Sequence, residues 1–414
     1  MGEWKEYNLG DLVELKNGVA FKSSEFIESG IPVIKIKNVK PNKILLDDLS
    51  YVSEHSSQNK KCFDILPSDI LITMTGNRKD GGPDSWVGKV ALFGKSGRYL
   101  LNQRVSAIRV KRKDLVEYQY LAYLLSCWDA QLYFVNHSNS SGGQANISPD
   151  VVYGYNVTLP SLSEQTRIAA ILSSLDDKIE VNRRINDNLE QQAQALFKSW
   201  FVDFEPFRDQ PFVESELGMI PEGWSVGNIY EYIDVIYGAP YKSTLFNDNK
   251  DGLPLIRIRD LKTNAPQFYT PEVLPNTEYI NAGDIVAGMD AEFIPYVWLG
   301  EKGVLNQRCC KFKGKNEAIS NYYILFLIKP ELEYVQSYKT GTTVSHLGKS
   351  DIDRFRFITP PLDVVLTFSE KINAMKQEVV SRAKESRRLA ELRDTLLPRL
   401  MSGELKVNEI ENTI

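Results

Sequence analysis

The sequence predicts a mixed α/β (α+β) protein with two similar globular domains. An antiparallel coiled coil of two long helices separates the domains, and an internal pseudo-two-fold axis relates the two halves. Three observations predict this architecture: the chain repeats itself once, each copy mixes short apolar runs with turn residues, and each copy ends in a long stretch without glycine. The expected boundaries are 1–160 and 206–360 for the globular domains, 161–205 and 361–405 for the helices, and 406–414 for a tail.

The repeat consists of short identities at matching positions. Gly18 is matched by Gly238, and the tripeptide Asn-Gln-Arg occurs at both 102–104 and 306–308. Further matches join Trp4 to Trp224, Lys22 to Lys242, Phe26 to Phe246, Lys35 to Arg257, and Lys37 to Arg259. A duplication of this kind predicts two copies of one structural unit in a single chain. Its binding target should therefore have two parts.

Within the first copy, local patterns predict short strands. Residues 31–37 alternate apolar and basic side chains, as a half-buried strand does. Residues 69–74 and 87–93 indicate further strands, 117–134 indicates a helix, and 138–143 indicates a loop.

Two long stretches predict the helices. Residues 163–205 contain neither glycine nor proline, and Ser161 and Glu164 fit a helix-initiating capping box. Asn182 and Asn186 interrupt an apolar seam with heptad spacing, in which a buried Asn fixes the register. The two rows are Ile168, Leu175, Leu189 and Leu196, and Leu172, Ile179, Ala193 and Trp200. Residues 362–397 repeat the pattern, with Arg382 in the place of Asn182.

Chain connectivity predicts how the helices pair. The domain of residues 206–360 follows the end of one helix and precedes the start of the other, so those two ends must lie close together. The helices are therefore expected to be antiparallel, and each should be roughly 55 Å long at ~1.5 Å per residue.

Composition limits the classes of function. The chain has 414 residues, a formal net charge of −5, three histidines and four cysteines without metal-ligand spacing. The Gly-Lys-Ser triplets at Gly94 and Gly348 lack the preceding glycine of a phosphate-binding loop, and Thr359-Pro360-Pro361-Leu362 departs from the amino-methyltransferase motif. We expect no catalytic residue, no metal site and no cofactor. Since no apolar run has the length of a membrane helix and no signal peptide is recognisable, we expect a cytoplasmic protein.

The charge distribution leaves nucleic acid open as a partner. An acidic chain argues against a free-standing DNA-binding domain, yet lysine and arginine cluster at four places. The clusters are Lys35, Lys37, Lys40 and Lys43; Arg109, Lys111, Arg112 and Lys113; Arg257, Arg259 and Lys262; and Lys311, Lys313 and Lys315. Such clusters are commonly solvated strand faces. They also suit a subunit whose partners make part of the DNA contact.

The helical regions resemble a known family. Residues 159–165, 168–172, 176–180 and 195–204 are similar to the central conserved region of type I restriction-modification specificity (S) subunits. Residues 392–405, Leu-Arg-Asp-Thr-Leu-Leu-Pro-Arg-Leu-Met-Ser-Gly-Glu-Leu, resemble that family's distal conserved region. The resemblance covers the whole chain through its order of variable domain, helix, variable domain, helix. One departure is Asp363-Val364-Val365, where the first helix has Ser163-Glu164-Gln165.

The resemblance implies a non-catalytic DNA-recognition subunit. In this family each target recognition domain, here 1–160 and 206–360, reads one half of a split, asymmetric sequence in double-stranded DNA. The helices set the distance between the halves and dock two methyltransferase (M) subunits, and restriction/translocase (R) subunits complete the complex. Those partner subunits would use S-adenosylmethionine, ATP and Mg.

Candidate DNA contacts are basic or loop residues of both domains. They are Lys35, Lys37, Arg78, Lys79, Arg104, Gly142 and Gly143 in the first domain, and Arg257, Arg259, Arg308, Lys339, Thr340 and Thr343 in the second. The segment 78–82 has no counterpart in the second copy, as different half-sites require. The alternatives are a solvated strand face for the paired basic residues, a structural turn for Asn-Gln-Arg, and a seat on the helices for the loops 139–146 and 340–346. Trp200 and Phe201 are expected in the helical core.

Two other functions remain open at this point. A two-headed scaffold would bind proteins through its globular ends, and a self-sufficient nuclease would cleave DNA with Mg²⁺. Steep weakening of binding with salt distinguishes DNA contact from the scaffold.

Overall fold

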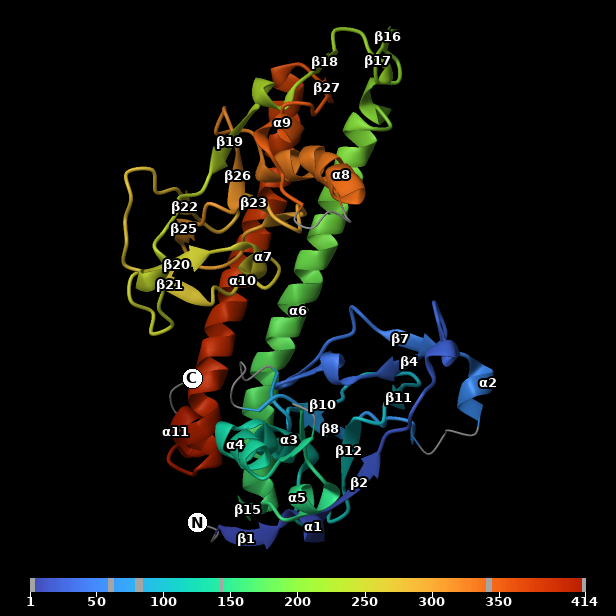
Figure 1. Ribbon diagram of the computed structural model, residues 1–414, viewed down its shortest axis with the longest axis vertical. Coiled ribbons are helices and arrows are strands. Elements are labelled where there is room, and N and C mark those ends of the chain that lie inside the picture. The colour runs from blue at the N-terminus through green and yellow to red at the C-terminus, as the bar shows by residue number, and fades with distance from the viewer. Residues whose placement is uncertain (1–3, 59–62, 79–84, 142–143, 340–344, 412–414) are drawn as a thin grey trace. The chain divides into compact units, whose positions relative to one another are not determined.

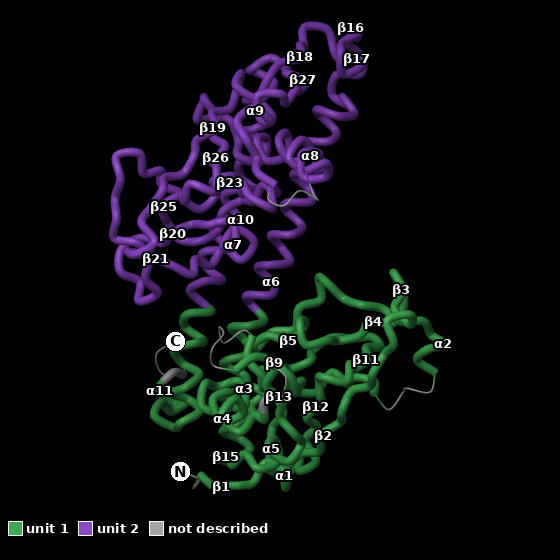
Figure 2. The backbone as a smooth tube through the Cα atoms, in the orientation of Figure 1, with its two compact units in different colours: residues 1–177, 390–414 green, residues 178–389 purple. Residues whose placement is uncertain are grey.

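The computed structural model describes residues 4–58, 63–78, 85–141, 144–339 and 345–411 (Figure 1). It contains two compact units: residues 1–177 with 390–414 form unit 1, and residues 178–389 form unit 2 (Figure 2). The division falls inside both long helices, α6 (Leu162–Phe201) and α10 (Leu362–Met401). No helix of the described residues is long and apolar enough to cross a membrane.

Two four-stranded sheets form the centre of unit 1. The first is antiparallel, in the order β10 (Val90–Leu92), β8 (Ile70–Thr73), β12 (Val105–Val110), β2 (Val13–Asn17). The second has the order β11 (Leu100–Leu101), β4 (Ile31–Ile34), β7 (Ser50–Val52), β3 (Phe26–Ile27), and β11 is parallel to β4. Smaller pairings are β13 (Asn139–Ser141), β14 (Gln144–Asn146) and β9 (Thr75–Gly76); β1 (Lys5–Asn8) with β15 (Asn156–Leu159); and β5 (Val39–Lys40) with β6 (Lys43–Ile44).

Unit 2 repeats these sheets. Its first sheet has the same order, β24 (Pro295–Val297), β23 (Ile285–Gly288), β26 (Cys309–Gly314), β19 (Ile233–Tyr237). Its second sheet is β22 (Tyr279–Ile280), β25 (Gly303–Leu305), β20 (Leu253–Ile256), β21 (Phe268–Thr270), with β25 parallel to β20. The pair β18 (Ser225–Gly227) with β27 (Phe357–Thr359) corresponds to β1 with β15, and one hairpin is added, β16 (Phe212–Ser215) with β17 (Gly218–Pro221). The predicted mixed α/β duplication is confirmed.

Helices accompany the sheets in both units. Unit 1 has α1 (Leu9–Leu12), α2 (Glu54–Ser57), α3 (Tyr118–Ser126), α4 (Trp128–Asn136), α5 (Pro149–Tyr153) and α11 (Val407–Glu411). Unit 2 has α7 (Ile258–Leu261), α8 (Asn321–Lys339) and α9 (Lys349–Ile352). The helix predicted at 117–134 is instead two helices, because Cys127 has an extended backbone (ψ 153°) that ends α3.

Two other local predictions are wrong in part. The strand expected at 31–37 ends at Ile34, because Asn38 Oδ1 accepts the Lys35 N–H (3.0 Å) and starts a 3₁₀ turn, Ile36–Asn38. Unit 2 does the same, since Asp260 Oδ2 accepts the Arg257 N–H (3.0 Å) at the start of α7. In the loop expected at 138–143, residues 139–141 form β13, because their backbone pairs with β14.

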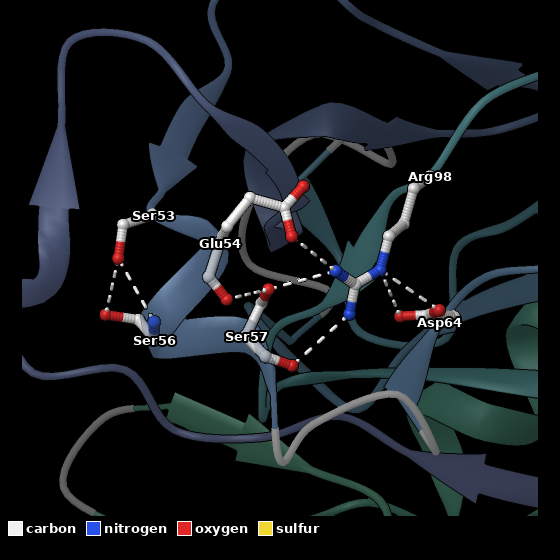
Figure 3. Close-up of polar contacts among 6 residues, drawn as sticks. All are labelled: Ser53, Glu54, Ser56, Ser57, Asp64 and Arg98. Carbon is white, nitrogen blue, oxygen red and sulfur yellow. Dashed lines mark hydrogen bonds and ion pairs between the residues drawn. The ribbon is translucent and has the colours of Figure 1, made fainter.

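The second sheets differ at one edge. In unit 2, β22 is a strand beside β25, whereas in unit 1, among the residues that the structure describes, a single bridge joins Asp64 to Leu100 of β11. Arg98 holds this segment in place: its Nε donates to both Asp64 oxygens at 3.1 Å, and its Nη1 donates to Ser57 Oγ at 2.9 Å (Figure 3). A side-chain network of Arg98 with Ser57 and Glu54 of α2 thus accompanies the bridge at this edge.

The long helices run antiparallel in each unit, as connectivity predicts. In unit 2, Asn186 of α6 donates to Val379 O of α10 (3.2 Å), and farther along α6 the Phe201 ring lies 4.8 Å from that of Phe368. In unit 1, Arg393 of α10 donates to Asp176 of α6 at 2.6 Å, and Asp176 also accepts from Tyr123 Oη (2.6 Å). Burial raises the pKa of Tyr123 above its ordinary value, so this hydroxyl stays protonated and donates.

A polar layer interrupts the seam of unit 2. Asn182 has 0% of its surface exposed; it accepts from Arg382 (3.1 Å) and donates to Glu385 (2.8 Å) and Ser386 (3.3 Å). A shift of one helix along the other would leave this buried amide without partners, at a cost of about 1–3 kcal/mol. The layer therefore specifies the register.

Each unit encloses the start of one long helix and the end of the other. The core of unit 1 contains Ile168 and Leu172 together with Leu397 and Leu400. The core of unit 2 contains Phe197 and Phe201 of α6 together with Val365 and Phe368 of α10. Trp200 packs against this core with its ring 5.6 Å from that of Phe368.

Gln165 attaches the start of α6 to unit 1. Its fully buried side chain accepts the Glu117 N–H (3.0 Å) and donates to Leu115 O (2.8 Å) and Pro160 O (3.0 Å). Val365 holds the matching place in α10 and lies in the apolar core. One turn later, Ser369 Oγ accepts the Ser320 N–H (2.9 Å) at the start of α8. In the second copy, Ser369 therefore attaches the start of the long helix to its unit, as Gln165 does in the first copy.

Replacing Gln165 with Ala is expected to destabilise unit 1. The change leaves a buried N–H and two carbonyl groups without their partner, which costs about 1–3 kcal/mol. Urea unfolding followed by circular dichroism should show a lower midpoint. The control is Gln194→Ala, an exposed position on the same helix, which should leave the midpoint unchanged. Equal midpoints for the two variants would contradict this role of Gln165.

Candidate nucleic-acid interface

The Asn-Gln-Arg tripeptide forms the same turn in both units. In unit 1, Asn102 N–H donates to Ile34 O (3.0 Å) and Gln103 N–H donates to Val19 O (2.9 Å). In unit 2, Asn306 donates to Ile256 O and Gln307 donates to Ala239 O, both at 3.0 Å. A Cβ on Gly18 would lie 2.1 Å from Asn102 O, and one on Gly238 would lie 2.1 Å from Asn306 O. The structural-turn alternative thus accounts for the repeated backbone, which requires glycine at this approach.

The arginine of each turn is on the surface, and its backbone carbonyl is hydrogen-bonded to a second segment of the chain. Arg104 O accepts the Met74 N–H (2.9 Å), and Met74 O accepts the Ile147 N–H (3.0 Å). In unit 2 the equivalent bonds join Met289 to Arg308 O (2.8 Å) and Leu347 to Met289 O (2.7 Å). We call these two places the arginine junctions. Both arginines are exposed, so their side chains are accessible to a ligand.

In unit 1 the junction lies beside an open hollow of about 410 Å³. Its lining residues are Ile36, Lys37, Lys40, Thr75, Gly76, Asn77, Ser85, Lys89 and Gln144. Arg104 Nη1 donates to Gln144 Oε1 at 2.8 Å, which brings the arginine to the same rim. Lys37 and Lys40 offer positive charge for phosphate, and Asn77 and Gln144 offer amide groups for base edges, whereas Lys89 is buried.

The sequence identified only part of this hollow. Of its lining residues, Lys37 was a candidate, whereas Lys40 belonged to a recognised basic cluster and was not chosen. Gln144 belongs to the loop 139–146, which was considered as a whole, whereas Lys89 and Asn77 were not among the candidates. Lys89 lies in a buried apolar run, and the folded chain alone brings Gln144 next to Arg104. Nothing in the local sequence of Lys89 or Asn77 marks these two residues.

The other first-unit candidates differ in their surroundings. Lys35 Nζ lies 3.6 Å from the centre of the Phe26 ring, and burial, followed by the neighbouring charge of Lys37, lowers the pKa of Lys35. Lys37 is exposed and forms an ion pair with Asp48. Arg78 is exposed and follows Asn77 of the hollow. Lys79, Gly142 and Gly143 lie outside the described residues, as does most of the segment 78–82.

In unit 2 the junction is built around a carboxylate. Asp290 Oδ2 accepts from Arg308 Nη1 at 2.9 Å, and Asp290 Oδ1 lies 2.7 Å from His346 Nδ1. Lys339 Nζ donates to His346 O (2.7 Å) and forms an ion pair with Asp351. This candidate therefore links the backbone of His346 to α9. Thr340 and Thr343 lie outside the described residues. Asp290 was not among the candidates, and His346 belongs to the loop 340–346, which was considered only as a whole.

Arg257 follows β20 and does not lie on a solvated strand face, so that alternative is wrong for this residue. Its side chain is 16% exposed, lies 4.3 Å from the centre of the Phe268 ring and has Asp260 at 3.7 Å. Burial lowers its pKa from the ordinary value, although Asp260 opposes this. Arg259, two residues later in α7, is exposed. Among the described residues, no three His, Cys, Asp or Glu side chains are grouped so as to hold a metal ion.

Comparison with known proteins gives the class. The model of the family described as "Type I restriction modification DNA specificity domain" matches residues 1–191 and 221–392, once in each half of the chain. The chain therefore belongs to this family. It is a type I specificity subunit, a DNA-recognition component of a class that is itself non-catalytic.

Individual relatives are similar over nearly the whole length. The chain is 26% identical to the type I restriction enzyme HindI specificity subunit of Haemophilus influenzae, over 98% of this chain and 100% of the relative. It is 24% identical to the putative MjaX specificity subunit of Methanocaldococcus jannaschii, over 98% and 94% respectively. A crystal structure of the type I restriction-modification S subunit from M. genitalium covers 96% of both chains at 14% identity, with a TM-score of 0.54, and supports the fold.

Replacing Lys37 and Lys40 together with Ala is expected to weaken DNA binding without regard to sequence. If both contact phosphates, the slope of log affinity against log salt should become shallower by about two units, close to one per contact. Fluorescence anisotropy with a mixed-sequence duplex at several salt concentrations measures this.

The matched control for this pair is Lys16→Ala with Lys113→Ala, two lysines of the same unit that do not line the hollow. It should preserve the slope. The same slope for both double variants and the unchanged chain would remove the hollow from the DNA interface.

Proposed function

We propose that this chain reads a bipartite, asymmetric DNA sequence, with one half-site for each target recognition domain, 1–160 and 206–360. The observation that supports this most directly is the arginine junction: each unit presents an exposed arginine on the same backbone turn. A shared framework with one accessible guanidinium per unit suits two separate contacts with base edges or phosphates. The remaining candidates of both domains belong to the same proposal.

We further propose that the helices 161–205 and 361–405 serve two tasks. They set the separation of the half-sites, and they dock two methyltransferase subunits. Restriction/translocase subunits would join this assembly in the cytoplasm, where the DNA is. The partner subunits would bring S-adenosylmethionine, ATP and Mg, because the class to which the chain belongs is itself non-catalytic. The scaffold and the self-sufficient nuclease are disfavoured by the family to which the chain belongs.

The first test exchanges one recognition domain. Because β1 pairs with β15, the exchange must include both strands, so residues 1–160 are replaced by the equivalent segment of a relative. Only one half of the recognised sequence should change, because each domain has its own sheets and core. Genome-wide mapping of methylated adenines, in a host that expresses the complete system, provides the measurement. A change in both halves would contradict independent reading.

The second test shortens the helices. Deleting residues 180–186 and 380–386 removes one heptad from each helix and takes out the polar layer together with its partners. The seam phase is kept, and each helix becomes shorter by ~10 Å. The expected product is folded and prefers a shorter gap between the same two half-sites, as measured by methylation mapping. Deleting the seven residues of only one helix is the control and should disrupt the seam. An unchanged gap in the double deletion would refute the spacer role.

A further inference from the structure

The two arginine junctions have the same backbone and different side chains. The backbone bonds of Met74 and Met289 place Thr75 where Asp290 lies, Asn146 where His346 lies, and Arg104 where Arg308 lies. The pairing agrees, because Thr75 is opposite Asn146 in the β9–β14 ladder and Asp290 forms a bridge with His346. These positions are therefore structurally equivalent, and their side chains can be compared directly.

In unit 1 the junction is neutral apart from its arginine. Thr75 Oγ1 donates to Asn146 Oδ1 at 2.7 Å, while Arg104 is held by the amide of Gln144. Within the described part of the chain, the Asn146 Nδ2 group has no hydrogen-bond acceptor, so it can donate to a ligand. Side-chain amides of Asn and Gln match the adenine edge, where N7 accepts and N6 donates.

In unit 2 the carboxylate sets the chemistry of its neighbour. A carboxylate accepts hydrogen bonds and does not donate them, so the neutral imidazole of His346 carries its proton on Nδ1, toward Asp290. The opposite nitrogen, Nε2, is then an acceptor, on a side chain that is 58% exposed. Such an acceptor suits the exocyclic amine of cytosine or adenine. Arg308, with 66% of its side chain exposed, keeps further N–H groups for the O6 and N7 atoms of guanine.

The side-chain pair of unit 2 is not required to hold the backbone. Leu347 N–H donates to Met289 O (2.7 Å) and Ala291 N–H donates to Ser345 O (3.0 Å), so the segment is already fixed on both sides of His346. Ion pairs with a partner this exposed contribute only about 0–1 kcal/mol to stability. A purely structural role therefore leaves the different chemistry of the two junctions unexplained.

We propose that the arginine junctions are the specificity determinants, and that the residues differing between them make the target asymmetric. Asp290, His346 and Arg308 read the second half-site: His346 Nε2 accepts from the amine of cytosine or adenine, and Arg308 donates to guanine. Thr75, Asn146 and Arg104, with Gln144, make the equivalent contacts in the first half-site. This inference rests on the proposed function, because it assigns residues to the reading of each half.

The experiment transplants one junction into the other. The double variant Asp290→Thr, His346→Asn gives unit 2 the side chains of unit 1, and the full chain is used to select duplexes from a random pool. Loss of the His346 contact should reduce the preference at one or two adjacent positions of one half-site by about tenfold or more. The other half-site should be selected as before. A second variant, His346→Ala, alters an exposed side chain and should lose the same preference without acquiring a new one.

Two controls separate the possible outcomes. Asp248→Asn removes an exposed charge elsewhere in unit 2 and should select the original sequence. If both junction variants also select the original sequence, the inference is overturned while two-part DNA reading stands. Changes in both half-sites would overturn it as well, because the junction would not act locally. If the unchanged chain selects no sequence, both the proposed function and the inference fail.

Discussion

The antiparallel seam between α6 and α10 is the interaction on which each unit depends. Neither helix could bury its apolar side alone, and each core is completed by residues from both. The core of unit 1 includes Leu397 and Leu400 of α10. This helix begins at Leu362, some 190 residues after Leu172, the last fully buried residue that α6 contributes to the same core. This long-range closure costs chain entropy, and burial of apolar side chains from both helices offsets it.

Buried polar groups then restrict the seam to one arrangement. Apolar rows alone tolerate a shift by one heptad, since leucine packs against leucine in either register. Asn182 removes this freedom because its amide reaches its three partners in only one register. Gln165 and Ser369 act similarly where each helix begins, by accepting the backbone N–H that precedes α3 or α8. The two copies thus fix the start of each long helix to its unit with different residues.

In both duplicated domains, the residues that fix the backbone turn differ from the residues whose side chains face the surface. Glycine at 18 and 238, and the backbone of Asn-Gln-Arg, meet the same steric and hydrogen-bonding requirement in both copies. The side chains that face outward from this framework are free to differ, because they contribute little to stability. Under the proposal that the chain reads an asymmetric site, the contrast between Thr75 with Asn146 and Asp290 with His346 would provide this combination.

The sequence by itself determined the duplication, the two long helices, their antiparallel direction and the polar interruption of the seam, because heptad spacing and connectivity are local or topological properties. It also named Arg104 and Arg308, the exposed arginines of the two junctions, as candidates. Only the tertiary structure showed that Lys35 and Arg257 begin short helical turns, since an Asn or Asp three residues later accepts their N–H. It alone brought Gln144 to Arg104 and His346 to Asp290, because those contacts join segments distant in the chain, and their geometry depends on the packing of whole sheets.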